Sequence, residues 1–411
     1  VTGVQTCALP ISDTDGSVRL CCVSDEYVYK STGEKYNLGY DKVEDVINSN
    51  NMKQIRQDML DGKSISGCKK CYDAENSNGI SYRKQYIHLW KDDESLLRKY
   101  NQSLNGDIDP TVEYYDLRYG NLCNLSCRSC YSGASSQFDK DIRELQSTTN
   151  IMKFHGPNDK DLNSWYETTI FSHNLNSQLK NLKEYYTTGG EPTLNDKNFE
   201  IITKMIETGD SKHCILKFNT NLTNTKKDFY STFQHFNNVV FMCSVDGYGP
   251  MQEYLRYPSK WDMIASNLDK LIDMKLNNIK IIITPVIQKT NLGYITDLFE
   301  YVENYNKKHN RLLISMSPII LADPSYLSLL YLPTAYKIKC WEKIEDWINH
   351  NCKYQDKVFH LRMNQVKAKC YEETDYKENL KNYFEFTDIF DNHRNQNIQI
   401  LNPELSALRV W

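Results

Sequence analysis

The sequence predicts an α/β fold built on a parallel sheet that is buried on both faces. Two observations support this prediction, namely short runs of β-forming residues and amphipathic stretches between them. The predicted strands are residues 112–117, 182–186, 215–218, 239–245, 279–286 and 312–317. The predicted helices between them include residues 198–208, 261–274 and 291–305. Six continuous apolar strands that alternate with helices are typical of β/α units in a parallel sheet.

The amphipathic stretches have the spacing of helices with one buried face. In residues 261–274, for example, Ile264, Leu268, Leu271 and Ile272 recur at helical spacing. Beyond residue 320 the pattern is helical, with apolar faces in residues 335–348 and 357–371. We therefore expect residues 112–320 to form the α/β core and residues 321–411 to form a helical C-terminal cover.

The first residues are expected to be foreign to the protein. Residues 1–11 resemble the in-frame translation of a short-read sequencing adapter, so residues 1–12 are left out of fold reasoning and Cys7 is treated as accidental. An intact homologous gene that carries these residues in frame would refute this interpretation. Residues 13–83 are predicted to form a small cysteine-rich domain, and residues 84–111 a polar linker.

Three cysteines follow the first predicted strand of the core. Cys123, Cys127 and Cys130 have the spacing C-x-x-x-C-x-x-C and come after a Gly-Asn turn. A structural metal site uses four protein ligands, so three thiolates without a fourth nearby indicate an iron–sulfur cluster with one open iron. A zinc knuckle or three free thiols is the alternative.

Further motifs come at the ends of the next predicted strands. Gly189 and Gly190 allow a ligand to approach the backbone and Glu191 offers a carboxylate, although the same residues also suit a tight turn. Ser244 opens a Ser-x-Asp-Gly motif. The guanidinium of Arg256 is either a bidentate partner for a carboxylate or a solvated charge at a helix end.

Together these motifs resemble those of the radical SAM superfamily, in which C-x-x-x-C-x-x-C follows the first strand. The resemblance implies a partial (β/α)6 TIM-type barrel with an open side. It also implies that the three cysteines hold a [4Fe–4S] cluster whose open iron binds S-adenosylmethionine. One electron then breaks the sulfonium C–S bond and releases a 5′-deoxyadenosyl radical, which abstracts a substrate hydrogen. The electron would come from a reductant such as flavodoxin or ferredoxin.

The resemblance also assigns residues to S-adenosylmethionine. Gly189, Gly190 and Glu191 match the family's G-G-E-P motif, which grips the methionine amino group. Ser244 corresponds to a serine at the ribose or carboxylate, and Arg256 to an arginine at the methionine carboxylate. Asn221, in Asn-Thr-Asn, resembles a weaker ribose-binding element. One departure is Ser129, because many members carry an aromatic residue there, next to the adenine.

The N-terminal cysteines resemble a second known element. Cys21 and Cys22, followed by Cys68 and Cys71 in a C-x-x-C pair, are similar to the twitch or SPASM type of auxiliary-cluster domain. The resemblance implies an auxiliary Fe–S cluster on Cys21, Cys68 and Cys71, with Cys22 as the alternative to Cys21. A four-thiolate zinc site would use the same residues. Such domains usually follow the barrel, whereas this one precedes it, and the family's further cysteine has only Cys7 near its position.

Composition limits the classes of function. The net charge is −4 without a basic stripe, which gives nucleic-acid binding no electrostatic support. No apolar run approaches the roughly 20 residues that span a bilayer, and the cysteine spacing argues against a secreted disulfide framework, so we expect a cytoplasmic protein. The resemblance favours a peptide or protein substrate. A small-molecule substrate, or a non-catalytic Fe–S or zinc protein that transfers electrons or acts as a sensor, remains the alternative.

Overall fold

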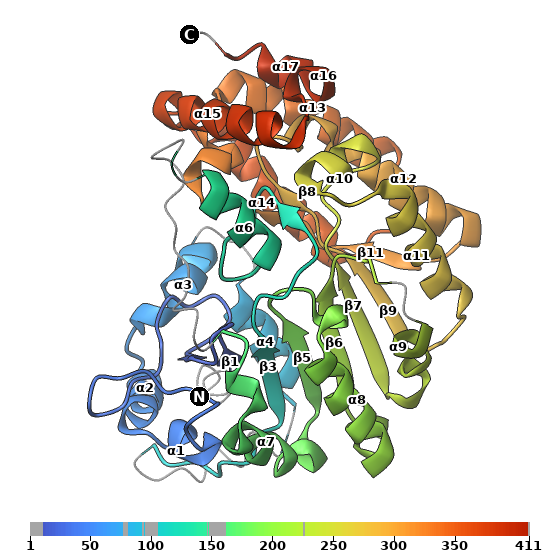
Figure 1. Cartoon of the computed structure of the whole chain (residues 1–411). Coiled ribbons are helices and arrows are strands. Elements are labelled where there is room, and N and C mark those ends of the chain that lie inside the picture. The colour runs from blue at the N-terminus through green and yellow to red at the C-terminus, as the bar shows by residue number, and fades with distance from the viewer. Residues whose placement is uncertain are drawn as a thin grey trace. The chain divides into compact units, whose positions relative to one another are not determined.

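The computed structural model describes residues 11–76, 81–92, 94, 106–145, 147, 162–224 and 227–409. The chain divides into two compact units (Figure 1). The first unit comprises Val1–Leu122, Pro157–Phe218 and Lys227–Val239. The second comprises Cys123–Gly156, Asn219–Lys226 and Val240–Trp411.

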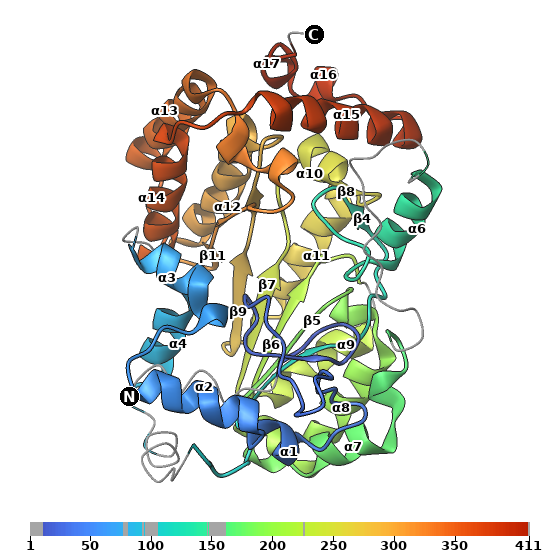
Figure 2. The ribbon, with the colours of Figure 1, turned by 90° about the vertical axis from the view of Figure 1, so that its left-hand side faces the viewer.

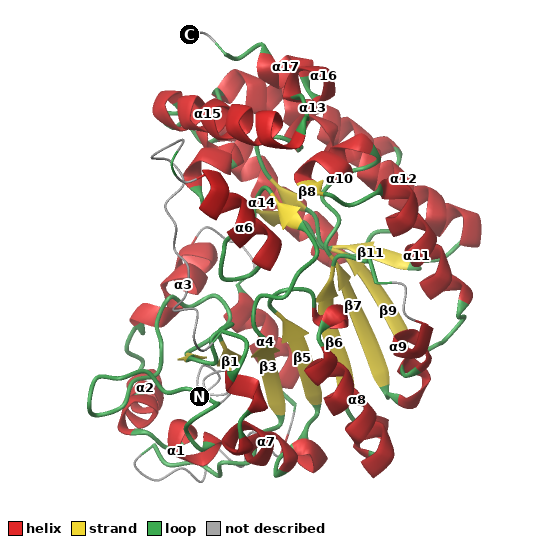
Figure 3. Ribbon diagram, in the orientation of Figure 1, coloured by secondary structure: helices red, strands yellow, loops and turns green. Residues whose placement is uncertain are grey.

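A parallel sheet forms the centre of the first unit (Figure 3). Strands β3 (Tyr114–Arg118), β5 (Glu184–Thr188) and β6 (Ile215–Thr220) are parallel neighbours. The short strand β1 (Ile11–Ser12) pairs in parallel with β3 and antiparallel with β2 (Val18–Arg19). The strand order in this unit is therefore β6-β5-β3-β1-β2.

The helices of the first unit come from its N-terminal and middle segments. They are α1 (Val43–Ile47), α2 (Asn50–Leu60), α3 (Lys69–Asn76), α4 (Tyr82–Trp90), α7 (Thr169–Asn176), α8 (Asp196–Thr208) and α9 (Lys227–Ser231). Local signals set several ends, because Ser49 caps α2 through the Met52 amide, and α8 ends at Gly209 with φ of 82°. The predicted linker boundary after residue 83 falls inside α4. Residues 95–105 of the linker, and residues 1–10 with Cys7, lie outside the described residues.

The two faces of this sheet differ in chemistry. Tyr115, Leu117 and Tyr185 point to one face and are buried, as the prediction of apolar strands requires. The alternate positions carry Asp116 on β3 and Glu184 on β5, both buried as well. The sheet is thus buried as expected, but one face is charged where the sequence analysis expected a continuous apolar run.

The second unit contains the remaining strands of the predicted core. Strands β7 (Asn238–Cys243), β9 (Ile279–Ile283) and β11 (Ile314–Met316) are neighbours in the order β11-β9-β7, and β9 and β11 are parallel. Two short pairs are added, β4 (Ser126–Cys127) with β8 (Arg256–Tyr257) and β10 (Val286–Ile287) with β12 (Ile319–Ile320). All six strands that the sequence predicts for the core are present across the two units.

Helices make up most of the second unit. They are α6 (Ser136–Leu145), α10 (Pro250–Leu255), α11 (Trp261–Asp273), α12 (Ile295–His309), α13 (Thr334–His350), α14 (Lys357–Tyr371), α15 (Lys377–Arg394), α16 (Ile398–Leu401) and α17 (Pro403–Ser406). The prediction of helices after residue 320 is confirmed, and α13 and α14 lie side by side (Figure 2). None of the described helices is both long and apolar enough to cross a bilayer.

Candidate functional site

The three cysteines after β3 lie together in the second unit. Cys123 and Cys127 pack with Leu125 in one buried group, and Cys130 packs against it. The loop is held by hydroxyls, since Ser135 Oγ donates to the Leu125 carbonyl at 2.6 Å and Ser136 Oγ donates to the Cys123 carbonyl at 3.1 Å. The sequence prediction that these thiols gather on one loop is therefore consistent with the structure.

Arg256 reaches this group through the pairing of β4 with β8. Cys127 lies opposite Arg256 in the register of the two strands. The Arg256 Nη1 is 3.6 Å from the Cys127 Sγ, and its Nε donates to Asp246 Oδ2 at 2.7 Å. The interpretation of Arg256 as a solvated charge is wrong, because its side chain is only 12% exposed and is paired with a carboxylate.

The pKa values of the cysteine thiols show what the loop needs in order to hold thiolates. Burial raises the pKa values of Cys127 and Cys130, and Arg256 works against this rise at both thiols. A buried thiolate needs such compensation, and a metal cluster supplies it outright. Two buried thiols and a half-buried third, with one guanidinium beside Cys127, fit the [4Fe–4S] cluster that the sequence resemblance implies. Among the described residues, no group of three or more His, Cys, Asp or Glu side chains is placed to bind a single metal ion. A cubane differs from such a site, because each of its thiolates binds a different iron.

Asn221, Ser244 and Asp246 belong to the same unit as the cysteine loop. The side-chain Nδ2 of Asn221 donates to Oδ1 of Asn124 at 2.9 Å, and Asn124 directly follows Cys123 in the chain. Ser244 is half-buried at the end of β7, and its amide donates to the Thr220 carbonyl at 2.8 Å. Asp246 was not singled out as a site residue from the sequence. It is fully buried and accepts from Arg256 and, at 2.8 Å, from the Val286 amide.

The Gly189-Gly190-Glu191 turn belongs to the first unit. An added Cβ at Gly190 would lie 2.2 Å from the Leu122 carbonyl oxygen, and the Glu191 amide donates to that same oxygen at 2.7 Å. Leu122 directly precedes Cys123, so the glycines set the start of the cysteine loop. The Glu191 carboxylate is buried and accepts from the Thr193 hydroxyl at 2.6 Å. The motif is thus a tight turn, and its contact with methionine remains a prediction.

The N-terminal cysteines line one small cavity in the first unit. The cavity has a volume of about 30 Å³, and its lining comprises Ile11, Leu20, Cys21, Cys22, Cys68, Cys71, Tyr82, Arg83, Tyr86 and Tyr114. Cys68 and Cys71 are buried at the start of α3. Burial raises the pKa of Cys68 to about 11, with further contributions from Cys21 and Cys71, so these three thiols lie near one another.

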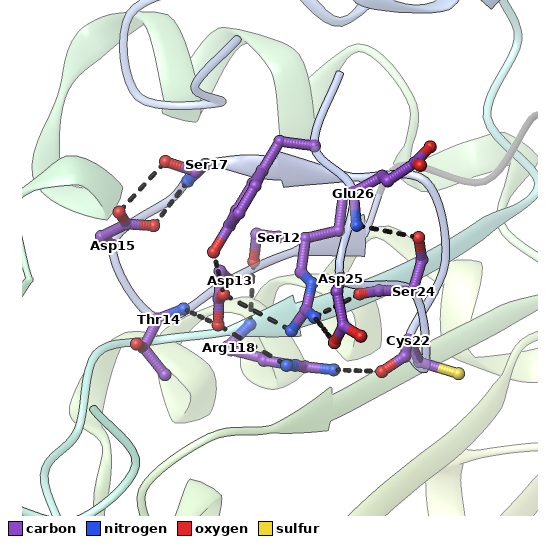
Figure 4. A network of polar contacts seen from close by, with 12 residues as sticks. Ser12, Asp13, Thr14, Asp15, Ser17, Cys22, Ser24, Asp25, Glu26 and Arg118 are labelled. Carbon is purple, nitrogen blue, oxygen red and sulfur yellow. Dashed lines mark hydrogen bonds and ion pairs between the residues drawn. The ribbon is translucent and has the colours of Figure 1, made fainter. Parts of the chain in front are cut away.

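Cys22 has different neighbours from Cys21. Burial raises the pKa of Cys22 to about 12, and the next largest cause is the Asp116 carboxylate rather than Cys68 or Cys71. The Cys22 carbonyl accepts from Arg118 Nη2 at 3.4 Å (Figure 4). Of the two alternatives that the sequence leaves open, this placement favours Cys21 as the partner of Cys68 and Cys71.

These features define an α/β protein with a three-thiol loop after the first strand of a mostly parallel sheet. No protein-family model matches the sequence, and no curated protein matches it either. Among solved structures, anSMEcpe with bound AdoMet is similar at a TM-score of 0.38 and 14% identity, over 60% of this chain and 64% of that chain. The chain therefore spans less than two thirds of the anSMEcpe chain.

A second similar structure is SuiB of Streptococcus suis. Bound to S-adenosylmethionine, it aligns at a TM-score of 0.36 and 13% identity, over 80% of this chain and 66% of that chain. Bound to the precursor peptide SuiA, it aligns at a TM-score of 0.36 and 13% identity, over 90% of this chain and 78% of that chain.

Proposed function

We propose that this protein is a radical SAM enzyme that modifies a peptide or protein. The observation that carries the proposal is the packed group of Cys123, Cys127 and the half-buried Cys130, with Arg256 beside Cys127. These three thiols would hold a [4Fe–4S] cluster, which when bound would supply the electron for reductive cleavage of S-adenosylmethionine and hydrogen abstraction from the substrate.

The residues of the chain would hold and orient the cofactor. Asp246 holds the Arg256 guanidinium through its Nε while its Nη1 faces the Cys127 sulfur, and Arg256 is the proposed partner of the methionine carboxylate. Gly189 and Gly190 allow the turn before Glu191, the proposed partner of the methionine amino group, to pack closely against Arg118 and Leu122. Asn221 and Ser244 are the proposed contacts to the ribose.

The N-terminal cysteines would hold an auxiliary Fe–S cluster. Cys21, Cys68 and Cys71 lie near one another around an apolar cavity, which suits a cluster shielded from water. Zinc on the same thiolates is the competing assignment. The resemblance of residues 13–83 to twitch and SPASM domains is what supports a peptide or protein, rather than a small molecule, as the substrate.

Anaerobic purification followed by iron and sulfide analysis tests the proposal. We expect more iron than one cluster requires, and release of 5′-deoxyadenosine when S-adenosylmethionine and dithionite are added. Zinc without iron, or an iron-loaded preparation that leaves S-adenosylmethionine intact, would instead identify an electron-transfer or sensor protein. Cleavage that is stimulated by a nucleotide or sugar but not by peptides would favour the small-molecule alternative.

A further inference from the structure

A surface groove of about 600 Å³ runs along one face of α12 in the second unit. Helix α12 contributes side chains at three- and four-residue intervals, from Asp297 through Glu300, Tyr301 and Tyr305 to Lys308. Residues with this spacing form a single stripe on a helix. Tyr248 also lines the groove, from the loop after β7. We call this feature the α12 groove, and none of these residues belongs to the candidate cofactor site.

Helix α11 holds the tyrosine rings of the α12 groove in place. Trp261, at the start of α11, packs against Tyr248 and Tyr301 with 4.9 Å between the ring centroids in each pair, so α11 and α12 lie side by side (Figure 1). Tyr305 packs against Tyr301 at 5.2 Å between centroids, and its hydroxyl donates to Asp269 of α11. Tyr248 remains 43% exposed. Partly exposed tyrosines gathered in one groove are typical of a binding surface.

Two carboxylates, Asp297 and Glu300, form an acidic end of the α12 groove. Asp297 is in the first turn of α12, and Glu300 follows one turn later, where Trp347 Nε1 donates to its Oε2 at 2.8 Å. Among the described residues, neither carboxylate forms an ion pair with a lysine, arginine or histidine. Partial burial raises the pKa of Asp297, and no charged neighbour offsets this rise. The acidic end therefore carries carboxylates that the described part of the chain leaves without a cation.

The lysines around the α12 groove are distant from the acidic end or are engaged elsewhere. Lys308 lies at the opposite end of the groove, about three turns and about 16 Å further along the helix axis. This separation exceeds the roughly 8 Å over which charges act through solvent at physiological salt. Around α11, Lys260 pairs with Glu253 at 3.0 Å, and Lys270 donates to Asn267 at 3.1 Å. A cationic ligand at the acidic end would therefore meet little repulsion.

A groove in the first unit shows how this chain combines a tyrosine and a carboxylate around a cation. It has a volume of about 650 Å³, and its lining includes Lys30, Tyr36, Asp41, Glu44 and Asp45. Lys30 Nζ is 2.7 Å from Asp41 Oδ1 and 5.5 Å from the centre of the Tyr36 ring. In the α12 groove, no lysine or arginine of the described residues lies over a tyrosine ring. The α12 groove thus presents the same two groups to solvent, where a ligand can reach them.

We propose that the α12 groove binds an arginine side chain of a peptide, with the guanidinium at Asp297 and Glu300 and its flat face against the tyrosines. A guanidinium suits this groove better than an ammonium, because its planar group pairs with a carboxylate and stacks on an aromatic ring at the same time. The groove, about 16 Å along α12, is long enough for about five residues of extended chain. This inference rests on the proposed function and names a contact, outside the candidate cofactor site, that holds its peptide substrate.

Two matched peptide pools and four variants test the inference. The pools are N-acetylated, C-amidated random decapeptides with either arginine or citrulline, which has the same shape without the charge, at the fifth position and no other arginine or lysine. Asp297→Asn removes a charge from the acidic end, and Tyr248→Leu removes the exposed ring. The controls are Lys308→Gln, at the opposite end of the groove, and Asp61→Asn, which removes a charge from the C-terminal end of α2 in the first unit. Retention of each pool by the anaerobically purified protein is measured by mass spectrometry.

We expect the wild type to retain the arginine pool at least about fivefold better than the citrulline pool, because citrulline loses both the cation–π contact and the ion pair. Asp297→Asn and Tyr248→Leu should each lower this ratio at least about twofold, and their combination should bring it to about one. Both controls should leave the ratio unchanged. An acidic residue in the first turn also stabilises a helix, so melting temperatures are measured alongside. A purely structural Asp297 would lower the melting temperature on substitution without changing the ratio.

The inference is overturned if the wild type retains both pools equally, if neither groove variant lowers the ratio, or if Asp61→Asn lowers it as much as Asp297→Asn. A third pool, with lysine at the fifth position, that is retained better than the arginine pool would overturn the choice of a guanidinium. Failure of the proposed function is distinguishable, because a wild type that prefers the arginine pool without cleaving S-adenosylmethionine refutes only the enzymatic assignment. Cleavage by a protein that retains both pools equally refutes only the peptide contact.

Discussion

The two cysteine groups of this protein differ in what surrounds their sulfurs. At the loop of Cys123, Cys127 and Cys130, the Arg256 guanidinium is 3.6 Å from one sulfur, and Arg394 also influences the pKa of Cys127. The group of Cys21, Cys68 and Cys71 lines an apolar cavity together with tyrosines, and Arg83, whose side chain also lines this cavity, is paired with Glu75.

The two groups also differ in how the fold holds them. Helix α15 anchors the first loop, because Arg394 Nη2 donates to Ser126 Oγ at 2.6 Å and to Asp141 at 2.8 Å, and Arg128 pairs with Asp391 at 2.5 Å. In the group of Cys21, Cys68 and Cys71, the cysteines lie on a short turn, a 3-10 segment and the start of α3. A cationic, strongly anchored site suits a cluster that must be reduced, whereas an apolar cavity suits a cluster that meets substrate or passes an electron on.

The largest expected difference between the groups follows from removing one thiol from each. Cys127→Ala should abolish 5′-deoxyadenosine formation, because the proposed [4Fe–4S] cluster would lose one of its three protein ligands. Cys68→Ala should spare this cleavage while lowering the iron content and stopping product formation. Chromatographic assay of 5′-deoxyadenosine with parallel iron analysis checks both variants, and equal loss of cleavage in the two would contradict the division of labour.

The start of the first loop gives a second way to separate the groups. Gly190→Ala would bring a Cβ to 2.2 Å from the Leu122 oxygen, so the backbone that leads into Cys123 must shift. We expect cleavage of S-adenosylmethionine to fall at least about tenfold, since a misplacement of about 1 Å can cost about a hundredfold in rate. Gly293→Ala is the matched control, because its nearest atom would be the Tyr336 hydroxyl at 3.4 Å. Similar activity in both variants would show that the close approach at Gly190 is unimportant.

Stability measurements can sharpen the contrast in anchoring. Arg128→Met leaves the largely buried Asp391 without its cation and should lower the free energy of unfolding by about 3 kcal/mol. Arg143→Met breaks the more exposed pair with Asp139, where the arginine is 43% exposed, and should cost less than about 1 kcal/mol. Denaturant unfolding of the two variants under anaerobic conditions checks this order. Equal losses would mean that α15 does not anchor the loop through Arg128.

The sequence predicted the strands and the cysteine loop because both depend on local patterns. Runs of β-formers gave all six core strands, and the spacing from Cys123 to Cys130 placed three thiols on one loop. What the sequence left open depends on partners far apart in the chain. The pairing of Arg256 with Asp246 and Cys127 arises from β4 and β8, two-residue strands that are too short to have a sequence signal.

The charged sheet face escaped prediction for a related reason. Asp116, Glu184 and Lys217 lie on three different strands, and each looks like an isolated polar residue within an apolar run. Only the register of the strands brings them to one face. The same holds for Cys21 and Cys22, since adjacent residues cannot be told apart by spacing. Both line the cavity with Cys68 and Cys71, but Cys21 contributes to the raised pKa of Cys68, whereas Asp116 contributes to the raised pKa of Cys22.

The smallest expected effect concerns the charge that α15 brings to the first loop. Arg394 is buried, its guanidinium carbon lies 4.3 Å from the centre of the Phe390 ring, and its charge acts on Cys127. A nearby cation favours the more negative, reduced state of a cluster, so Arg394→Gln should lower the reduction potential by an amount on the order of tens of millivolts. Potentiometric titration followed by electron paramagnetic resonance checks this shift. Arg409→Gln, which removes a more exposed charge paired with Asp388, is the control and should leave the potential unchanged. An unchanged potential in Arg394→Gln would mean that Arg394 only holds Ser126 and Asp141 in place. Arg256 alone would then account for the cationic surroundings that distinguish the loop of Cys123, Cys127 and Cys130 from the group of Cys21, Cys68 and Cys71.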